Sequence, residues 1–254
     1  MVKKTITIVL LLTSIVITGC ASQQQLAFQS VKGKTHSAVT PVEQTVDWAV
    51  KWWGPRHDAV NERLKKGNVD LLFIGDSITH GWENTGKEIW DAYYAKRNAV
   101  NTGFSGDRTQ HVLWRLDHSN FENISPKLAV VMIGTNNSNG NDNTAEEIAD
   151  GIIVICHRLR TRLPKTKILL LAIFPRNPKP SAQRQKNAEA SQLASRIADG
   201  KTIYYLDINS SFLTDDGLLS KDIMPDYLHP NKTGYKIWAE AMESKIAQLM
   251  GEHK

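Results

Sequence analysis

Short apolar runs that end at a glycine or a proline recur along this chain from residue 69 onward. Each run is short and continuous rather than alternating, which is typical of a strand buried on both faces. Segments with helical patterns separate the runs, and this alternation predicts a parallel sheet with helices on both sides, a three-layer α/β/α fold. The expected strands are 69–74, 98–101, 128–133, 167–174 and 202–206, and the expected helices are 87–96, 108–117, 145–163, 181–198 and 231–250.

Length and composition fit one soluble domain. A chain of 254 residues can bury a large core, and 41% hydrophobic with 22% charged residues is ordinary for a globular protein. The pattern contains no internal repeat. A net charge of +5 is too small to indicate a nucleic-acid partner. Cys156 lies on the apolar face of an expected helix, where we expect a buried and unreactive thiol.

The first twenty residues have the pattern of a secretory signal. Lys3 and Lys4 precede an apolar stretch over Ile6–Ile17, which is too short to span a bilayer as a mature helix. The ending Ile17-Thr18-Gly19-Cys20 resembles a bacterial lipobox. This resemblance implies cleavage before Cys20 and lipidation of its sulfur. The alternative is an ordinary cleaved signal followed by an incidental cysteine.

These features predict three segments: a lipoprotein signal peptide over residues 1–19, a flexible tether over 20–45 and a folded catalytic domain over 46–254. The tether is expected because residues 22–40 are rich in Gln and Ser. Loss of the two signal lysines lowers the net charge from +5 to +3. We therefore expect a lipid-anchored protein of the bacterial cell envelope, at the periplasmic or outer-membrane face in a Gram-negative cell.

Four polar blocks follow the expected strands or precede the last expected helix. In open parallel sheets ligands bind at the carboxyl ends of the strands, so the blocks should converge on one edge. None is specific alone, but together they offer a nucleophile, two N–H donors and an acid–base pair, as acyl transfer requires. The blocks are Gly75-Asp76-Ser77-Ile78-Thr79, Gly103-Phe104-Ser105-Gly106-Asp107, Gly134-Thr135-Asn136-Asn137 and Asp226-Tyr227-Leu228-His229-Pro230.

Ser77 is the candidate nucleophile, and His229 is its candidate base. Asp226 lies three residues before His229, so one tight turn can direct both side chains to the same point. Simpler interpretations exist, because Ser77 could merely cap a helix and an Asp-x-x-His loop is usually a solvated turn. The first block is not the Gly-x-Ser-x-Gly elbow of α/β-hydrolases, since Thr79 occupies its last position.

Gly106 and Asn136 are candidate donors to an oxyanion. A glycine allows close approach of its N–H, and an Asn just past a buried strand can present its amide to the same point. The alternatives are a tight turn at Gly106 and a turn-forming residue in an Asn-rich loop. The histidines show no spacing typical of metal ligands, so we expect neither a metal nor another cofactor.

The order of the Ser, Gly, Asn and Asp-x-x-His blocks resembles the SGNH (GDSL) hydrolase superfamily. The resemblance implies a flavodoxin-like, doubly wound parallel sheet. It also implies that Ser77, Asp226 and His229 are catalytic, and that the N–H groups of Ser77 and Gly106 form an oxyanion hole with the Asn136 side chain. Similarity to the catalytic subunits of platelet-activating factor acetylhydrolase Ib extends over about residues 58–250 and includes Gly106-Asp107, His111–Leu116, Gly134–Asn137, Pro175-Arg176 and Arg184–Asn187.

The third block departs from the usual Gly-x-Asn-Asp pattern, since Asn137 stands where Asp is usual, but the donor Asn136 is kept. The signal, the tether and a cluster of Trp48, Trp52 and Trp53 have no counterpart in the cytosolic acetylhydrolase, so its lipid-mediator substrate is not carried over. For the three tryptophans we expect packing in the core, with substrate contact as the alternative.

The expected reaction is hydrolysis of short, acetyl-type carboxylic esters, with O-acetyl groups on carbohydrates as candidate substrates for an envelope protein. Ile78, Thr135 and Leu228 are the candidate pocket residues, and the bulky Ile78 and Leu228 should crowd the acyl side. The alternatives are a lysophospholipase or thioesterase for longer acyl chains, and a non-catalytic envelope protein that binds glycan. The sequence leaves the oligomeric state open, including a homodimer.

Overall fold

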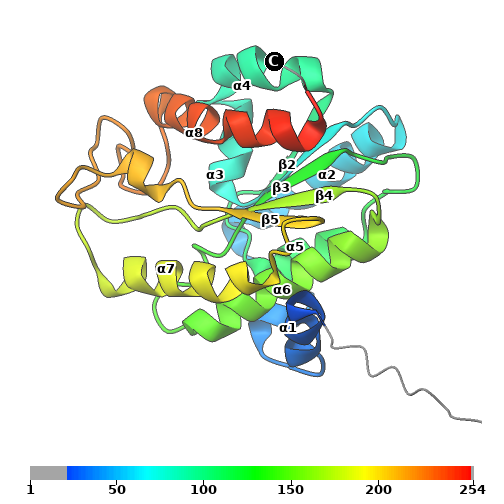
Figure 1. The fold of residues 1–254 in the computed structure, drawn as a ribbon, viewed down its shortest axis with the longest axis horizontal. Helices are drawn as coiled ribbons and strands as arrows, with labels where there is room; N and C mark the ends of the chain where they lie inside the picture. Colours follow the sequence, from blue (N-terminus) through cyan, green and yellow to red (C-terminus); the bar gives the residue numbers. More distant parts are fainter. Residues whose placement is uncertain (1–21, 253–254) are drawn as a thin grey trace, which may run out of the picture.

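The chain folds around a five-stranded parallel sheet (Figure 1). The computed structural model describes residues 22–252, so the expected signal peptide and Cys20 lie outside the described residues. The strand order β2-β1-β3-β4-β5 is the flavodoxin-like order, and the predicted fold class is confirmed. The strands are β1 (Leu71–Gly75), β2 (Ala99–Gly103), β3 (Leu128–Met132), β4 (Lys167–Leu171) and β5 (Ile203–Leu206).

Helices cover both faces of the sheet because successive strand residues point to opposite sides. Leu72 and Ile74 of β1 pack in one core, whereas Leu71 and Phe73 pack in the other. Figure 1 shows α5, α6 and α7 on one side of the sheet and α4 and α8 on the other. The helices are α1 (Gln23–Val31), α2 (Asp47–Lys65), α3 (Ser77–His80), α4 (Lys87–Tyr93), α5 (Thr109–Asp117), α6 (Ala145–Arg162), α7 (Ala182–Ala194) and α8 (Lys232–Met250).

The expected elements from residue 69 onward are all present, with ends shifted by a few residues. β4 ends at Leu171 rather than at 174, and the helix expected over 181–198 is α7 followed by a 3-10 turn. The 3-10 turns are η1 (Ser37–Val39), η2 (Gly81–Glu83), η3 (Ala95–Arg97), η4 (Ser195–Ile197) and η5 (Asn209–Phe212). None of the helices within residues 22–252 is long and apolar enough to cross a membrane.

Helix α2 is the long element that the sequence analysis did not predict. Pro55 lies inside it and obscures its periodicity, because an internal proline usually ends a helix. The helix continues since one face carries a buried stripe that anchors it to the core. That stripe consists of Ala49, Trp53, His57, Val60 and Leu64.

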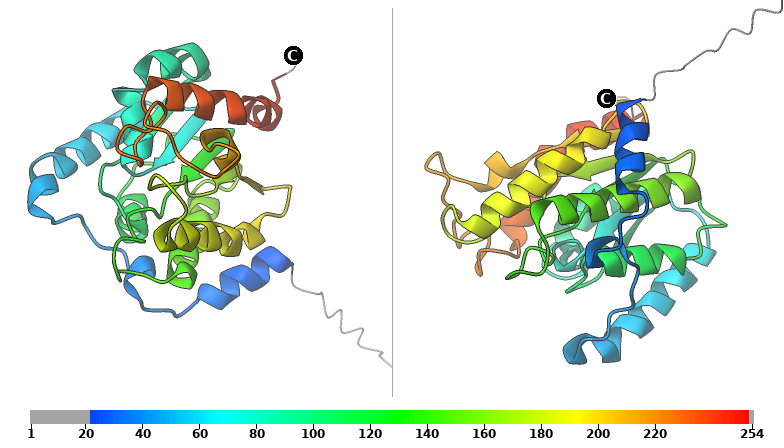
Figure 2. Two further views of the ribbon diagram at one scale, coloured as in Figure 1. Left: turned by 90° about the vertical axis from the view of Figure 1, so that its left-hand side faces the viewer. Right: turned by 90° about the horizontal axis from the view of Figure 1, so that it is seen from below.

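Residues 22–40, for which the composition predicts a flexible tether, differ from that expectation. Ser22 and Gln25 form a capping box at the start of α1, and Val31 at its end is buried. The helix packs against α6 and η4, and the ring of Phe28 lies 4.6 Å from that of His157. Figure 2 shows α1 in dark blue on the side of the molecule that is covered by α6 and α7. The segment was predicted to be flexible because it is rich in Gln and Ser, but its few apolar residues are enough to pack the helix against the domain.

The strand register brings the polar blocks to one edge of the sheet. Gly75 at the end of β1 pairs with Gly103 of β2 on one side and with Met132 of β3 on the other. The three strands therefore end at the same level, and the loops that follow them leave the sheet side by side. β1 and β3 flank the point where the strand order reverses, which is where ligands bind in sheets of this kind.

Two glycines allow α3 to pack directly on the strand ends. A Cβ on Gly75 would lie 2.1 Å from the Thr79 hydroxyl, and one on Gly103 would lie 2.3 Å from the His80 nitrogen. Any larger side chain at either position would push α3 away from the sheet. Ser77, the first residue of α3, is thereby held close to the ends of β1 and β2.

Candidate active site

The structure brings Ser77, His229 and Asp226 together at the carboxyl edge of the sheet. The Ser77 hydroxyl lies 2.8 Å from Nε2 of His229, and Nδ1 of His229 lies 2.6 Å from Oδ2 of Asp226. A carboxylate can only accept, so Nδ1 carries a proton and Nε2 is left to accept from the serine hydroxyl. In this arrangement His229 can remove the proton of the Ser77 hydroxyl while the Ser77 oxygen attacks a carbonyl carbon.

A tight turn aligns the histidine with its carboxylate. Oδ1 of Asp226 accepts the backbone N–H groups of Leu228 (3.0 Å) and His229 (2.7 Å), while Oδ2 is left for the imidazole. Tyr227 has a left-handed backbone with φ of 58°, which is uncommon for a bulky residue, and its carbonyl accepts the N–H of Asn177. The turn is therefore fixed both by its own carboxylate and by the loop after β4.

Asp226 and His229 are both partly exposed to solvent, and their hydrogen bond lowers the pKa of the carboxyl group. Partial desolvation raises the pKa of Asp226, but the hydrogen bonds from His229 outweigh it and hold that pKa below its usual range. The side chains of His229 and Asp226 are 44% and 55% exposed, so the relay is open to water. The carboxylate thus stays ionised at neutral pH without being buried.

Gly106 and Asn136 lie beside each other at the same edge and line a common cavity. Gly106 has φ of +79°, a left-handed conformation that glycine adopts without strain. One amide N–H of Asn136 donates to the Asp107 carbonyl at 2.9 Å, which fixes the side chain and leaves its second N–H available. Within residues 22–252, neither the Ser77 N–H nor the Gly106 N–H donates to another group.

Asn137, the residue that departs from the usual third block, holds the loops together. It is fully buried, its oxygen accepts the Thr109 N–H at 2.9 Å, and its amide donates to Gln110 and Asn143 at 3.0 Å. An aspartate here could accept but could not donate to these side-chain oxygens. The Asn at this position therefore fits its neighbours and leaves Asn136 facing the site.

A buried ion pair lies directly beneath the Gly106 loop. Nε of Arg115 lies 2.8 Å from Oδ2 of Asp107, and the indole N–H of Trp53 donates to Oδ1 at 2.7 Å. The remaining guanidinium N–H groups donate to the carbonyls of Thr102 (3.1 Å) and Gly75 (3.4 Å) at the ends of β2 and β1. Burial raises the pKa of Asp107 to about 6, although Arg115 opposes this shift.

Two of the three candidate pocket residues do not face the site. Ile78 is 1% exposed and packs in the core beneath α8, and Thr135 is fully buried with its hydroxyl accepting from Arg176 and Asn187. The expectation that Ile78 crowds an acyl group is therefore wrong, because its position in α3 turns it toward the sheet. Leu228 is half-buried and packs against the edge of the same core.

The three N-terminal tryptophans have three different environments. Trp53 is 1% exposed and packs in the core as expected, Trp52 is half-buried, and Trp48 is 59% exposed. A Cβ on Gly106 would lie 2.4 Å from the Trp48 ring, so this exposed indole rests on the Gly106 loop. Core packing is thus the wrong expectation for Trp48.

Arg176 lies next to the site and was not predicted as a site residue from the sequence. Its guanidinium donates to the Thr135 carbonyl (3.1 Å) and to Oδ1 of Asn139 (3.0 Å), which ties the loop after β4 to the third block. Desolvation lowers its pKa, while the charges of Asp76 and Asp226 oppose this effect. The Pro175-Arg176 pair in the sequence was the available signal, but nothing in it specified these contacts.

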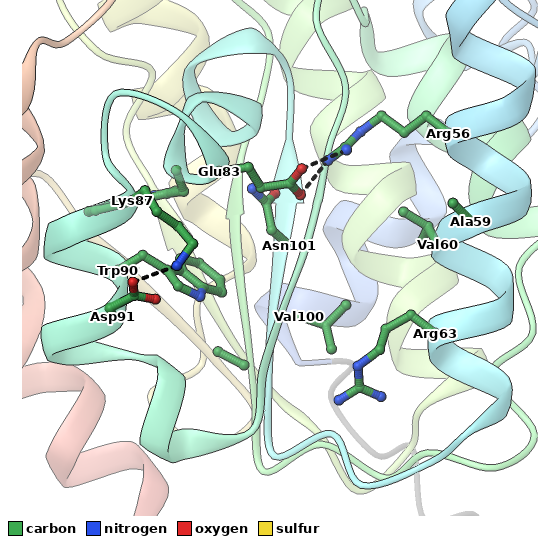
Figure 3. Close-up of a pocket in the computed structure, with 12 residues that line it drawn as sticks. Arg56, Ala59, Val60, Arg63, Glu83, Lys87, Trp90, Asp91, Val100 and Asn101 are labelled. Atoms are coloured by element: carbon green, nitrogen blue, oxygen red, sulfur yellow. Dashed lines mark hydrogen bonds and ion pairs between the residues drawn. The ribbon is translucent and has the colours of Figure 1, made fainter.

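A separate cavity of about 380 Å³ lies at the β2 edge between α2 and α4 (Figure 3). Four of its charged side chains form two pairs, Arg56 with Glu83 and Lys87 with Asp91. The fifth, Arg63, donates to the carbonyls of Gly67 and Asn68. It contains none of the candidate catalytic side chains, and we assign no chemistry to it. Within residues 22–252, no three His, Cys, Asp or Glu side chains gather to form a metal site.

The α/β/α sheet with these polar loops at one edge defines an SGNH-type hydrolase fold. The model of the GDSL-like lipase/acylhydrolase family matches residues 73–237, and the chain belongs to this family. The resemblance drawn from the four blocks is confirmed, and the protein is a carboxylic ester hydrolase of GDSL type.

Curated relatives support the same assignment. The chain is 39% identical over 201 residues to platelet-activating factor acetylhydrolase IB subunit alpha2 of Rattus norvegicus, covering 79% of this chain and 86% of the relative. It is 34% identical over 217 residues to the alpha1 subunit of Homo sapiens, covering 85% and 91%.

Solved structures share the fold at lower identity. A GDSL-like lipase of Bacteroides thetaiotaomicron has a TM-score of 0.58 at 21% identity, covering 78% of this chain and 97% of its own. A catalytic mutant of an acetylxylan esterase of Geobacillus stearothermophilus has a TM-score of 0.54 at 20% identity, covering 74% and 96%.

The burial of Asp76 makes the stability of the folded protein depend on pH. It is fully buried next to Ser77, Oδ1 accepts the Ile78 N–H at 3.0 Å, and Oδ2 has no partner among the described residues. Burial raises its pKa to about 7 from an ordinary value of 3.8. Because the ionised form is disfavoured only in the folded state, Asp76 should destabilise the protein progressively as the pH rises from about 4 to about 7.

We expect Asp76→Asn, which mimics the protonated carboxyl, to remove this loss. Urea unfolding at pH 4 and pH 8 should show that the variant gains up to about 4 kcal/mol relative to wild type at the higher pH. Equal stability differences at both pH values would contradict a raised pKa for Asp76.

Proposed function

We propose that this protein is a serine esterase that hydrolyses short, acetyl-type esters through a Ser77-His229-Asp226 triad. The observation that carries the proposal is the continuous hydrogen-bonded relay from the Ser77 hydroxyl (2.8 Å) through the imidazole to Asp226 (2.6 Å). A serine that only caps a helix has no need of a histidine on its hydroxyl, nor of a carboxylate on that histidine. The relay therefore favours catalysis over the simpler interpretation of Ser77.

The proposed reaction has two stages. Ser77 Oγ attacks the ester carbonyl carbon while its proton passes to Nε2 of His229, and the alcohol then departs with that proton as the C–O bond breaks. Water next attacks the acyl-serine and gives its proton to His229. Collapse of the second intermediate releases the carboxylic acid and returns the proton to Ser77.

Three N–H donors would stabilise the negative charge that forms on the carbonyl oxygen. The backbone N–H groups of Ser77 and Gly106 have no other acceptor within residues 22–252, and Asn136 keeps one free amide N–H. Donors that are already oriented gain strength when charge develops, and losing one costs on the order of 10²–10³ in turnover in comparable sites. The anchoring of Asn136 on the Asp107 carbonyl supports this preorganised role.

The nucleophile is tested with Ser77→Ala. We expect wild type to be labelled by a fluorophosphonate probe and to hydrolyse 4-nitrophenyl acetate, and we expect Ser77→Ala to lose the label and at least about 10⁴ in kcat. Ser105→Ala is the matched control, because its hydroxyl bonds His80 at the same sheet edge. A folded wild-type protein that takes no label and cleaves no ester would overturn the proposal.

The preference for short acyl groups rests on Leu228 and on the relatives. Leu228 stands directly before His229 and is half-buried at the edge of the site. Relatives of this chain include acetylhydrolase subunits, and one protein of similar fold is an acetylxylan esterase. Ile78 cannot contribute because it is buried in the core.

Acyl length is tested with 4-nitrophenyl esters from acetyl to octanoyl. We expect kcat/KM to fall about tenfold or more along the series, since an apolar chain must displace or bypass Leu228. Leu228→Ala should recover part of the octanoyl activity. A faster reaction with the octanoyl ester would instead favour a lysophospholipase or thioesterase.

We further propose that the protein is a lipoprotein of the bacterial envelope, anchored through Cys20. Support comes from the sequence alone, since the Ile17-Thr18-Gly19-Cys20 ending resembles a lipobox. Two features outside the lipobox fit the proposal: a positively charged start and an apolar stretch of signal length. An esterase anchored in this way would meet esters of the envelope or its surroundings.

Cys20→Ser tests the anchor in a bacterial host. Wild type should incorporate labelled palmitate and sediment with membranes, whereas Cys20→Ser should do neither. Cys156→Ala is the matched control, because Cys156 is the other cysteine and is buried in α6. Membrane sedimentation of unlabelled wild type would contradict lipidation at Cys20.

A further inference from the structure

The segment that leads into α2, together with the start of that helix, forms part of the rim of the site. Gln44 is 5% exposed, and its amide donates to the Gly106 carbonyl at 3.3 Å and contacts Nδ1 of His111 at 3.2 Å. The Val42 N–H donates to the Gln110 carbonyl at 3.3 Å. These contacts fix residues 42–48 against the loop that carries Gly106.

Trp48, in the first turn of α2, covers one side of Gly106. Its ring would collide with any Cβ at position 106, at 2.4 Å, yet 59% of the residue is exposed. Trp52 supports it, since the two ring centroids are 6.1 Å apart and the Trp52 indole N–H donates to the Trp48 carbonyl at 3.1 Å. An indole is therefore held in a defined position beside a proposed oxyanion donor, with much of its surface open.

A cavity of about 320 Å³ opens between Trp48 and the two proposed donors Gly106 and Asn136. Besides the indole, its walls combine the exposed apolar side chains of Val42 and Val46 with polar residues that include Glu43, Gln44, Arg108, His111 and Asn139. Arg108 is already paired with Asp142 at 2.6 Å, so the cavity does not present an unbalanced positive charge. A mixed lining of this kind matches a ligand that itself carries C–H surface beside polar groups, because its apolar parts then cover apolar walls while its polar groups keep hydrogen-bonding partners.

We infer that this cavity is the subsite for the alcohol part of the ester, and that the alcohol it takes is a carbohydrate ring. The inference rests on the proposed esterase function. A pyranose ring presents a face of C–H groups that can pack on the open indole of Trp48. Its hydroxyl groups are both donors and acceptors, and they match the carboxylate, amide and imidazole groups around the cavity.

The placement also explains why the indole is exposed beside the reaction centre. An exposed tryptophan gains nothing from the core, and an alcohol bound against it would bury part of its surface. Contact between the Trp48 ring and Gly106 would then hold the ring of the substrate at a fixed distance from the oxyanion donors. Trp48 is thus a specificity-determining residue rather than a catalytic one.

Trp48→Ala tests the subsite with two substrates: methyl 6-O-acetyl-β-glucopyranoside, which keeps three free hydroxyl groups, and 4-nitrophenyl acetate. We expect the ratio of kcat/KM for the sugar acetate to that for 4-nitrophenyl acetate to fall about tenfold, mainly through a higher KM for the sugar. Trp48→Phe should keep most of the ratio because it retains an aromatic face. Val50→Ala, an exposed apolar residue of α2 outside the cavity, should leave both rates unchanged.

The outcomes separate this inference from the proposed function. If wild type cleaves neither substrate, the esterase proposal itself fails. If wild type cleaves 4-nitrophenyl acetate but not the sugar acetate, or if Trp48→Ala lowers both rates equally, the esterase proposal stands and the carbohydrate subsite is overturned. A selective rise in KM for the sugar acetate, reversed in Trp48→Phe, supports the subsite.

Discussion

The buried ion pair between Asp107 and Arg115 is the interaction on which the site depends. It connects five parts of the chain, which are the Gly106 loop, α5, β1, β2 and α2. Arg115 of α5 also holds the carbonyls of Gly75 and Thr102, and Asp107 also binds Trp53 of α2. A charge pair with side chains 3% and 0% exposed is costly to desolvate, and removing one partner would leave the other uncompensated. The pair therefore fixes the ends of β1 and β2 and the Gly106 loop as one unit.

A second network holds the third block against the same unit. Asn137 binds the first turn of α5, and Asn136 binds the Asp107 carbonyl. The two neighbouring residues therefore differ in role: Asn137 is buried and holds the loop in place, whereas Asn136 presents a free amide N–H. Such rigidity suits a site in which donors must already be oriented when charge develops.

Much of the fold followed from sequence because its signals are local. The strand at 128–133 is continuous and apolar, and the helix from residue 145 has a capping box at Thr144 and Glu147, so both are visible in short windows. The sequence also predicts that the loops with Ser77, Gly106 and Asn136 leave the sheet at one edge, because parallel strands end at a common edge. Helix α2 was not predicted because it contains Pro55, and an internal proline usually ends a helix. Helix α1 was not predicted because its few apolar residues form a buried face only where they pack against α6.

The parts of the site that did not follow from sequence depend on side-chain direction and on contacts between distant segments. Ile78 and Leu228 look equivalent beside Ser77 and His229, yet α3 turns Ile78 into the core. Nothing in residues 42–48 indicates that Gln44 and Trp48 reach Gly106, more than fifty positions away. Such contacts are set by tertiary packing, which short sequence windows do not contain.

The openness of the Asp226–His229 pair has a consequence for the fate of the acyl group. Among the described residues, 44% of the His229 side chain and 55% of the Asp226 side chain are in contact with solvent, so bulk water reaches the proposed base directly. An acyl-serine formed here would meet water at its full concentration, whereas a competing alcohol must first be captured from dilute solution. In the proposed mechanism, this exposure would therefore favour release of the free acid over transfer of the acyl group to another molecule.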